Sequence, residues 1–334
     1  MSGAGERLRL AVVGCGRIAQ QHLAAIATVG EVRLAAVVDT REPAAKAVAE
    51  QYRCDALADY RDPRLAGALD AVVICTPPQT HADLARHFLE RGVHVMVEKP
   101  ITIRSADAQA LARLAQEKQR VLMMASKFRY VPDVQKAKAL VESGALGKIV
   151  LYENAFCSKV AMADRWNAQP DVAGGGVLID NGCHSADIAR YLLGPISHVH
   201  AHRGIAAQQL PVEDTVRFEF RTGGGSLGTV DLSWSLNKES DVYLALYGTQ
   251  GTLFCGWKES RYRQDGNPVF APFGSGYDKV AAFRGQIENF AAAIAQRAAP
   301  LITVQDALAS VEVVEAAYES MRRDAWVKVG EKAK

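Results

Sequence analysis

The sequence predicts an α/β protein in two parts, a doubly wound parallel sheet followed by a second α/β part. Two observations predict the first part: short β-branched runs alternate with Ala-rich amphipathic stretches, and a glycine-rich turn follows the first run. The chain has 334 residues, which is longer than one ordinary domain. We therefore expect two domains, residues 1–126 and residues 127–334.

Five apolar runs in the first part predict strands that are buried on both faces of a parallel sheet. They are Leu8–Gly14, Val32–Asp39, Ala71–Thr76, Val93–Glu98 and Val121–Ala125. Four amphipathic stretches between them predict helices: Arg17–Val29, Pro43–Tyr52, Thr80–Arg91 and Ser105–Lys118. Pro43 suits a first helical position and Ser105 suits an N-cap. This alternation places a ligand at the carboxyl ends of the strands.

The turn after the first strand reads G-C-G-R-I-A over Gly14–Ala19 and matches the G-x-G-x-x-G/A pattern of dinucleotide-binding turns. Gly14 permits the tight turn, Gly16 lets backbone N–H groups approach a pyrophosphate, and Ala19 lets the helix pack closely on the strand. The phosphates would lie at the positive end of the helix dipole. We expect the cofactor to contact Gly14, Gly16, Arg17, Ile18 and Ala19.

Asp39 ends the second strand, 20 residues after Ala19, where a ribose-binding acid belongs. A carboxylate there accepts hydrogen bonds from the ribose hydroxyls of NAD and repels a 2′-phosphate. Arg41 follows two residues later and could soften that repulsion, although a solvated loop residue is the preferred interpretation. The sequence thus favours NAD without excluding NADP.

Composition argues against several other classes of partner. The chain carries 39 basic and 37 acidic residues, so charge gives no reason to expect nucleic acid or an anionic membrane as partner. The six cysteines form no CxxC pair and are expected to be reduced thiols in a cytoplasmic protein. The polar start Met1–Glu6 and the short apolar runs predict neither a signal peptide nor a membrane span.

The second part shows strand-like runs followed by two long helical patterns. The strands are expected at Ile149–Cys157, Thr215–Arg221, Leu227–Trp234 and Tyr243–Tyr247, and the helices at Ala281–Arg297 and Val304–Arg323. Val216, Phe218 and Phe220 alternate with polar residues, which predicts one apolar face. Gly223–Gly225 supplies a hairpin turn. The Gly-, Pro- and charge-rich segment Leu253–Tyr277 fits a lid or an oligomer arm equally.

Four segments, in order along the chain, resemble those of one enzyme family. Thr76–His81 reads T-P-P-Q-T-H, and Glu98–Pro100 reads E-K-P at the end of a strand. Gly174–His184 reads G-G-G-V-L-I-D-N-G-C-H, and Gly248–Leu253 reads G-T-Q-G-T-L. With the G-x-G-x-x-A turn, these segments resemble the glucose–fructose oxidoreductase/inositol dehydrogenase (Gfo/Idh/MocA) family.

The resemblance implies a Rossmann domain and an α/β domain on an open, mostly antiparallel sheet, whose outer face makes a homodimer or homotetramer. It also implies hydride transfer between nicotinamide and a hydroxyl carbon of a small polyhydroxylated substrate: a sugar, a sugar derivative or a cyclitol. By resemblance, His184 is the general acid/base, and Lys99 and Asp180 hold the reacting hydroxyl. The resemblance also implies that the cofactor contacts five further residues: Thr76, Pro77, His81, Glu98 and Lys99.

The residues themselves agree with this implication. Lys99 follows the carboxyl end of a strand, where ligands bind in such sheets. Asp180 and His184 are four residues apart, so a helix from Asp180 to Leu193, ended by Gly194–Pro195, puts both on one face. An N-cap followed by a satisfied histidine is the alternative for this pair. No third ligand has zinc-site spacing, so no metal is expected.

Other polar residues are candidates for holding substrate. Lys127 and Arg129 directly follow the strand Val121–Ala125, and Arg165, Trp166 and Asn167 combine a cation, an aromatic surface and an amide. A loop packed on the sheet, with Trp166 as its anchor, explains the latter group equally well. His81 could equally be a helix residue, and Asp187 either orients His184 or is solvated.

Two further functions remain open beside the dehydrogenase. A redox-neutral enzyme would oxidise a sugar transiently and reduce it again, acting as a glycosidase. A non-catalytic NAD-binding regulator is disfavoured, because both Lys99 and His184 are present.

Overall fold

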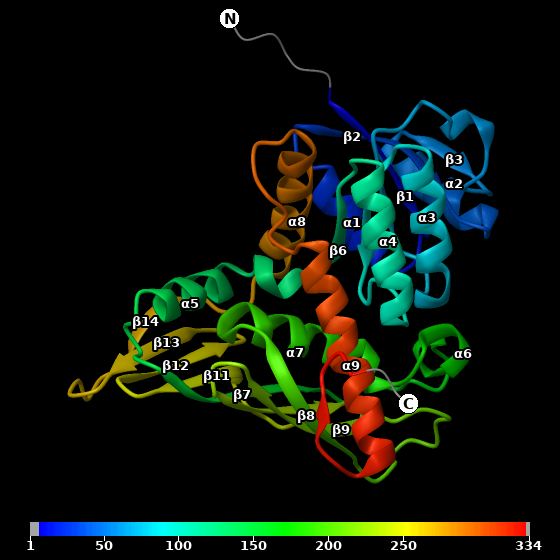
Figure 1. Ribbon diagram of the computed structural model, residues 1–334. Helices are drawn as coiled ribbons and strands as arrows, with labels where there is room; N and C mark the ends of the chain where they lie inside the picture. The colour runs from blue at the N-terminus through cyan, green and yellow to red at the C-terminus, as the bar shows by residue number, and fades with distance from the viewer. Residues whose placement is uncertain (1–6, 332–334) are drawn as a thin grey trace, which may run out of the picture. The chain divides into compact units, whose positions relative to one another are not determined.

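A computed structural model of the chain describes residues 7–331 (Figure 1). The predicted features of Met1–Glu6 lie outside these described residues. The chain divides into two compact units. The first contains the described residues up to Thr102, together with Ala106–Lys127 and Val280–Ala307. The second contains Ile103–Ser105, Phe128–Lys279 and the described residues from Leu308 onward.

The first unit is built on a six-stranded sheet in the order β3-β2-β1-β4-β5-β6, and every pair in it is parallel. The strands are β1 (Leu8–Val13), β2 (Val32–Val38), β3 (Asp55–Leu57), β4 (Ala71–Ile74), β5 (His94–Glu98) and β6 (Leu122–Ala125). The predicted doubly wound sheet is confirmed. Its strand order reverses between β1 and β4, which is where ligands bind in such sheets.

Five helices belong largely to this unit. They are α1 (Ala19–Ile26), α2 (Glu42–Tyr52), α3 (His81–Glu90), α4 (Ser105–Glu117) and α8 (Lys279–Ile294). The side chains of Phe283, Ile287 and Phe290 on α8 join the core that contains β1 and α1. The sequence predicted one boundary, between residues 126 and 127. The first compact unit also includes Val280–Ala307, because helix α8 completes its core.

The second unit contains a nine-stranded sheet in the order β14-β13-β12-β11-β7-β10-β9-β8-β15. Only β7 and β10 pair in parallel among its described strands, so the sheet is mostly antiparallel, as expected. The long strands are β7 (Ile149–Cys157), β8 (Ile196–Arg203), β9 (Thr215–Thr222), β10 (Leu227–Ser233), β11 (Val242–Gly248) and β12 (Gly251–Gly256). The short ones are β13 (Ser260–Gln264), β14 (Ala271–Gly274) and β15 (Val327–Lys328).

The helices of the second unit are α5 (Pro132–Glu142), α6 (Pro170–Ala173), α7 (Val177–Leu193) and most of α9 (Val304–Arg323). Helix α7 packs on β7, β9 and β10, and α5 packs on β12 and β14 (Figure 1). The inward residues Val216, Phe218 and Phe220 on β9 are each 1% exposed, which confirms the predicted apolar face. We call the opposite face of this sheet the outer face.

The segment Leu253–Tyr277 continues β12 and forms β13 and β14, which extend the sheet at one edge. Among residues 7–331, no helix has the length and apolar character that crossing a membrane requires.

Candidate functional site

Backbone geometry accounts for the first glycine of the turn after β1. Gly14 has a φ of +93°, in the region that favours glycine. A Cβ on Gly14 would lie 2.9 Å from the backbone carbonyl of Cys75 at the end of β4. The residue at position 14 must therefore lack a side chain for β1 and β4 to end side by side.

The beginning of α1 provides backbone N–H groups. No side chain among residues 7–331 caps this helix, whose N-cap residue is Ile18, and a Cβ built on Gly16 would have none of their heavy atoms within 4 Å. Ala19 is fully buried where the helix meets the sheet, whereas Arg17 is exposed. The first N–H groups of a helix carry partial positive charge, so this uncapped end fits a pyrophosphate.

Asp39 holds its carboxylate at the end of β2 in a fixed orientation. Oδ2 accepts a hydrogen bond of 2.8 Å from the N–H of Cys15, and Oδ1 accepts one of 2.8 Å from the N–H of Arg41. Burial opposes ionisation, but the hydrogen bonds from Arg41 and Cys15 outweigh it and lower the pKa of Asp39. Asp39 is thus an oriented carboxylate beside the glycine turn, as a ribose ligand requires.

Arg41 is paired as well as exposed. Its Nε lies 3.2 Å from Oδ1 of Asp39, while 68% of its side chain is exposed. The preferred interpretation of Arg41 as a merely solvated loop residue is therefore incomplete. Because the guanidinium lies beside the carboxylate, it reduces the negative charge that a 2′-phosphate would meet.

His81 is fully buried at the start of α3 and links two strand ends. Its Nδ1 lies 2.8 Å from the carbonyl oxygen of Pro100, and its Nε2 lies 2.9 Å from that of Thr76. Burial lowers the pKa of His81. A neutral imidazole has one N–H, so His81 donates to one of these two carbonyl oxygens, and its buried ring lies between Pro100 and the Thr76–Pro77 turn.

Glu98, at the end of β5, is buried and paired with a residue that the sequence gave no reason to single out. The Nε2 atom of His22 on α1 lies 2.8 Å from Oε1 of Glu98, and the N–H of Lys99 donates to Oε2 at 3.1 Å. Burial alone would raise the pKa of Glu98, but His22, Lys99 and Lys127 together lower it. The carboxylate therefore fixes the backbone from which Lys99 extends.

Lys99 itself is half-buried, and its peptide bond to Pro100 is cis. Lys127, in the first unit, is also half-buried, and its Nζ lies 6.0 Å from the ring centroid of Phe283 on α8. The negative charge of Glu98 lies close enough to both lysines for each to influence its pKa.

In the second unit, Asp180 and His184 lie on α7, as predicted. The helix begins at Val177, three residues earlier than expected, so Asp180 is within its first turn and is not an N-cap. His184 is 6% exposed, and its ring meets that of Phe128 edge-on at 5.1 Å. Gly194 ends the helix with a φ of +84°. The spacing of Asp180 and His184 directs both side chains to one face of α7.

The glycine triplet before α7 makes room for a carboxylate that caps the helix. Oε1 of Glu213 accepts hydrogen bonds from the N–H groups of Gly176 and Leu178 at 3.0 and 3.1 Å, and from the hydroxyl of Tyr318 at 2.7 Å. A Cβ on Gly175 would lie 1.9 Å from that hydroxyl. Glu213 thereby fixes the start of the helix that carries Asp180 and His184.

Arg129, a predicted substrate contact, lies in a buried ion pair. It is 3% exposed, and its guanidinium lies 2.6 Å from the carboxylate of Asp187, which is fully buried. It also lies over the ring of Tyr191, at 5.0 Å. Asp187 is therefore not solvated. This buried ion pair joins α7 to the segment that contains Phe128, so Arg129 positions these elements.

An aromatic cluster surrounds the Phe128 ring that meets His184. Phe156 stacks on Phe128 at 4.6 Å, and Tyr243 and Tyr277 lie 5.9 and 5.4 Å from it. Burial raises the pKa of both tyrosines, so they remain neutral donors. Sequence reasoning missed these residues, because each lies on a different strand or loop and no local pattern joins them.

The loop with Arg165 and Trp166 is anchored by another residue. Gln208 accepts a hydrogen bond from the N–H of Met162 at 3.0 Å and donates one to the carbonyl of Val160, also at 3.0 Å. Met162 is 2% exposed, whereas Trp166 is 41% exposed. Trp166 is thus not the buried anchor of the loop, and its ring is available as a surface.

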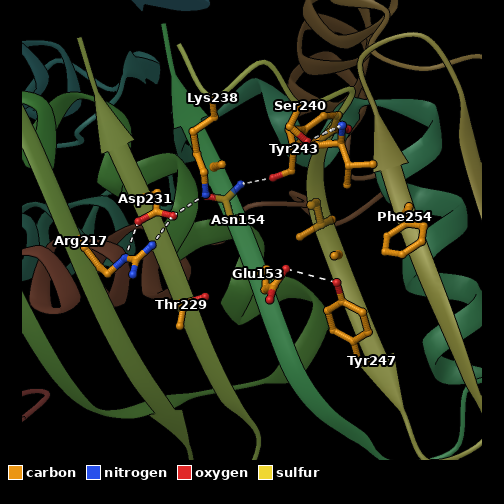
Figure 2. Close-up of a pocket in the computed structure, with 14 residues that line it drawn as sticks. Glu153, Asn154, Arg217, Thr229, Asp231, Lys238, Ser240, Tyr243, Tyr247 and Phe254 are labelled. Carbon is orange, nitrogen blue, oxygen red and sulfur yellow. Dashed lines mark hydrogen bonds and ion pairs between the residues drawn. The ribbon is translucent and has the colours of Figure 1, made fainter. Parts of the chain in front are cut away.

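A hollow in the second unit lies on the outer face, and Tyr243 of the aromatic cluster contributes to its lining (Figure 2). It has a volume of about 310 Å³. Arg217 and Lys238 both reach Asp231 there, at 2.6 and 2.7 Å, and the Tyr247 hydroxyl donates to Glu153 at 3.2 Å. None of the site residues expected from the sequence is among the described residues that line this hollow.

Comparison with known proteins covers both units. Residues 8–126 match the model of an oxidoreductase family with an NAD-binding Rossmann fold, and residues 134–254 match that of the GFO/IDH/MocA C-terminal domain. The chain is 26% identical to inositol 2-dehydrogenase of Rhizobium meliloti (strain 1021), over 96% of this chain and 99% of the relative. It is 27% identical to scyllo-inositol 2-dehydrogenase (NAD(+)) of Bacillus subtilis (strain 168), over 95% of each chain.

Solved structures agree with these sequence matches. The crystal structure of GenD2 from gentamicin A biosynthesis in complex with NAD superimposes with a TM-score of 0.87 at 27% identity. The match covers 99% of this chain and 98% of that one.

Proposed function

Because the chain belongs to the Gfo/Idh/MocA family of NAD(P)-dependent oxidoreductases, we propose that it oxidises or reduces a hydroxyl carbon of a sugar, a sugar derivative or a cyclitol. Family membership carries this proposal, because two family models match consecutive parts of the chain. The two relatives described above are named as inositol dehydrogenases, so a cyclitol is the first substrate to test.

The first unit fits NAD at the glycine turn. The uncapped start of α1 offers N–H groups to the pyrophosphate, and Asp39 offers an oriented carboxylate to the ribose hydroxyls. The Thr76–Pro77 turn, held by His81, borders the same edge of the sheet. When bound, NAD supplies the nicotinamide that exchanges hydride with the substrate. The Bacillus subtilis relative named above carries NAD(+) in its name, which supports NAD as the preferred form.

Each candidate catalytic residue has a separate role in the proposal. In the first unit, Lys99 donates a hydrogen bond to the reacting oxygen and stabilises negative charge as it develops there. In the second unit, His184 takes the hydroxyl proton during oxidation and returns it during reduction. Asp180, on the same helix face, holds the reacting hydroxyl and adjusts the acidity of its proton. Glu98 and Glu213 touch no substrate in this scheme and act by fixing the backbone of Lys99 and the start of α7.

Substrate contacts are proposed for Lys127, Arg165 and Trp166. The exposed ring of Trp166 can cover the apolar face of a sugar or cyclitol ring, while the two cations bind its hydroxyl groups. Arg129 is proposed as a further substrate contact, held in place by its buried ion pair with Asp187.

We also propose a homodimer or homotetramer that forms through the outer face. Leu151 and Leu227 are 45% and 46% exposed there, beside Trp326. Exposed apolar side chains on a sheet face are typical of an interaction surface. All six cysteines are free thiols, which supports the proposal that the protein resides in the cytoplasm.

A spectrophotometric screen at 340 nm tests the function. The purified protein is incubated with NAD or NADP and a panel of inositols, aldoses, uronic acids and nucleotide sugars. Reduction of the cofactor by one class identifies the substrate class, and the ratio of the kcat/KM values identifies the preferred cofactor. If no member of the panel is oxidised while NADH binds in a fluorescence titration, the dehydrogenase assignment is wrong, and a redox-neutral or regulatory function replaces it.

A further inference from the structure

Three histidines occupy alternate positions of β8, on the outer face of the sheet in the second unit. His198, His200 and His202 alternate with Val199 and Ala201, which are 0% and 1% exposed on the helix-covered face. Since side chains alternate along a strand, the three imidazoles point to the same side. Nothing in the hydride-transfer chemistry uses them.

Two of these histidines converge with an acidic residue from another element. The ring centroids of His200 and His202 are 4.3 Å apart, and Nε2 of His200 lies 3.9 Å from Oδ1 of Asp324. Asp324 follows the end of α9, so it reaches β8 from a distant part of the sequence. One donor atom from each of the three residues lies within 4.8 Å of the other two.

The distances in this cluster are not those of ordinary hydrogen bonds. A separation of 3.9 Å between Nε2 and Oδ1 exceeds hydrogen-bond range. Nε2 of His200 is shielded from solvent and has no hydrogen-bond partner among residues 7–331. A buried polar atom without a partner is uncommon, and an unassigned ion is one recognised reason for it.

Charged residues of both signs neighbour the cluster. Arg217, opposite His202 on β9, pairs with Asp231 at 2.6 Å, and Lys238 shares that carboxylate. Arg221 lies over the ring of Trp326, at 4.5 Å. Glu219, directly opposite His200 on β9, adds a negative charge to the outer face.

From this geometry we propose that His200, His202 and Asp324 form a binding site for a divalent transition-metal ion, with Zn²⁺ as the best match. Two imidazoles and one carboxylate are a donor set that zinc accepts, with water in the fourth position. Tetrahedral ligands of zinc lie about 3.3 Å apart, so the donor atoms must approach one another slightly. Rotation of the Asp324 side chain, which is 88% exposed, supplies that approach.

The bound ion would tie the end of α9 to β8. It would thereby reinforce the edge of the sheet at which only Val327 and Lys328 of β15 pair with β8. This role is structural and independent of the proposed hydride transfer. Either proposal can therefore be wrong while the other is right.

Isothermal titration calorimetry with Zn²⁺ on the chelator-treated full-length protein tests the site. We expect one Zn²⁺ per chain, and at least about tenfold weaker binding in each of His202→Ala and Asp324→Asn. Both side chains are exposed, so neither substitution removes core packing, and asparagine tolerates the positive φ of residue 324. His198→Ala is the matched control, because it removes an imidazole from the same face of the same strand outside the cluster.

A second readout excludes binding elsewhere. Zn²⁺ should raise the thermal unfolding midpoint of the wild-type protein and of His198→Ala, but not that of His202→Ala. Absence of saturable Zn²⁺ binding, or equal affinity in the wild-type protein and the two ligand variants, would overturn the proposal. Equal affinity would place the metal at another group, such as a cysteine.

Discussion

The imidazole of His22 and the carboxylate of Glu98 form a buried pair, with 2.8 Å between Nε2 and Oε1. His22 lies on the first helix of the chain, and Glu98 ends the strand that leads to Lys99. The pair therefore joins the helix that begins at the glycine turn to the residue proposed to polarise the substrate oxygen.

Removing His22 should destabilise the first unit. In His22→Ala, the buried carboxylate of Glu98 loses its nearest partner, so the free energy of unfolding at pH 7 should fall by about 2–4 kcal/mol. Urea denaturation measures the change. His22→Gln, which keeps a hydrogen-bond donor, should lose less; an equal loss would mean that packing against Phe283, and not the pair, is responsible.

The same pair predicts a pH dependence. The folded-state pKa of Glu98 lies below its ordinary value of 4.5, so its contribution to stability is present above that pH and is lost as the pH falls through the folded-state pKa. In His22→Ala, only Lys99 and Lys127 still oppose the effect of burial, so the pKa of Glu98 should be higher than in the wild-type protein. The stability difference between the two proteins should therefore shrink as the pH is lowered from 7 towards 4. A constant difference over this range would contradict the assignment.

Asp39 should determine cofactor preference. Asp39→Ala removes the carboxylate that would bind the ribose hydroxyls, so NADH affinity should fall by about tenfold or more, while NADPH affinity changes less. Fluorescence titration with both cofactors measures the effect. Arg41→Ala is the companion variant: it should weaken NADPH more than NADH. If Asp39→Ala weakens both cofactors equally, Asp39 does not contact the ribose.

Lys99 should matter for turnover far more than for cofactor affinity. Lys99→Met is expected to lower kcat by about 10²–10⁴-fold, because the developing charge on oxygen loses its cation. The affinity for NADH should change little. Lys118→Met, at an exposed position on the first unit, is the control for loss of a lysine. Wild-type kcat in Lys99→Met would exclude a catalytic role.

His184 should be visible in the pH–rate profile. His184→Ala is expected to reduce kcat by a similar factor and to abolish the acidic limb of the profile, because protonated imidazole can no longer block proton transfer. The ring also packs against Phe128, so circular dichroism must confirm that the variant is folded. A variant that is folded and slow but keeps the acidic limb would remove His184 as the base.

Glu213 should stabilise α7 through its N-terminal end. Glu213→Ala leaves two N–H groups and the Tyr318 hydroxyl without their acceptor, so the free energy of unfolding should fall by about 2–4 kcal/mol. Tyr318→Phe removes one of the three hydrogen bonds and should cost about 1 kcal/mol. A loss in Glu213→Ala no larger than that in Tyr318→Phe would show that the capping bonds contribute little.

The elements that could be predicted have strong local patterns. The apolar runs of the first sheet, the glycine turn and the helix expected from Asp180 to Leu193 can each be recognised within a few residues of sequence, although that helix begins at Val177. Strand β3 was missed because it has only three residues, one of them the charged Asp55. Strands β13 and β14 were missed because their composition is that of a loop, and their pairing at a sheet edge requires no apolar alternation.

Contacts between distant residues account for the rest. His22 and Glu98 are 76 residues apart, and Gly176 and Glu213 are 37 residues apart, so no window of sequence contains either relationship. The ion pair of Arg129 could not be predicted for the same reason. The position of Arg129 after a strand suggested a ligand contact, and its partner Asp187 comes from a helix much later in the chain.

Helix α8 lies late in the sequence, so the core of the first unit is completed late in synthesis. The ribosome releases the six strands of the first unit long before Phe283, Ile287 and Phe290, which fill part of their core. Until those residues emerge, the nascent sheet exposes apolar surface that chaperones recognise, and all strands of the second sheet except β15 are made in the interval. The first unit therefore reaches its final packing only after nearly the entire polypeptide has been translated.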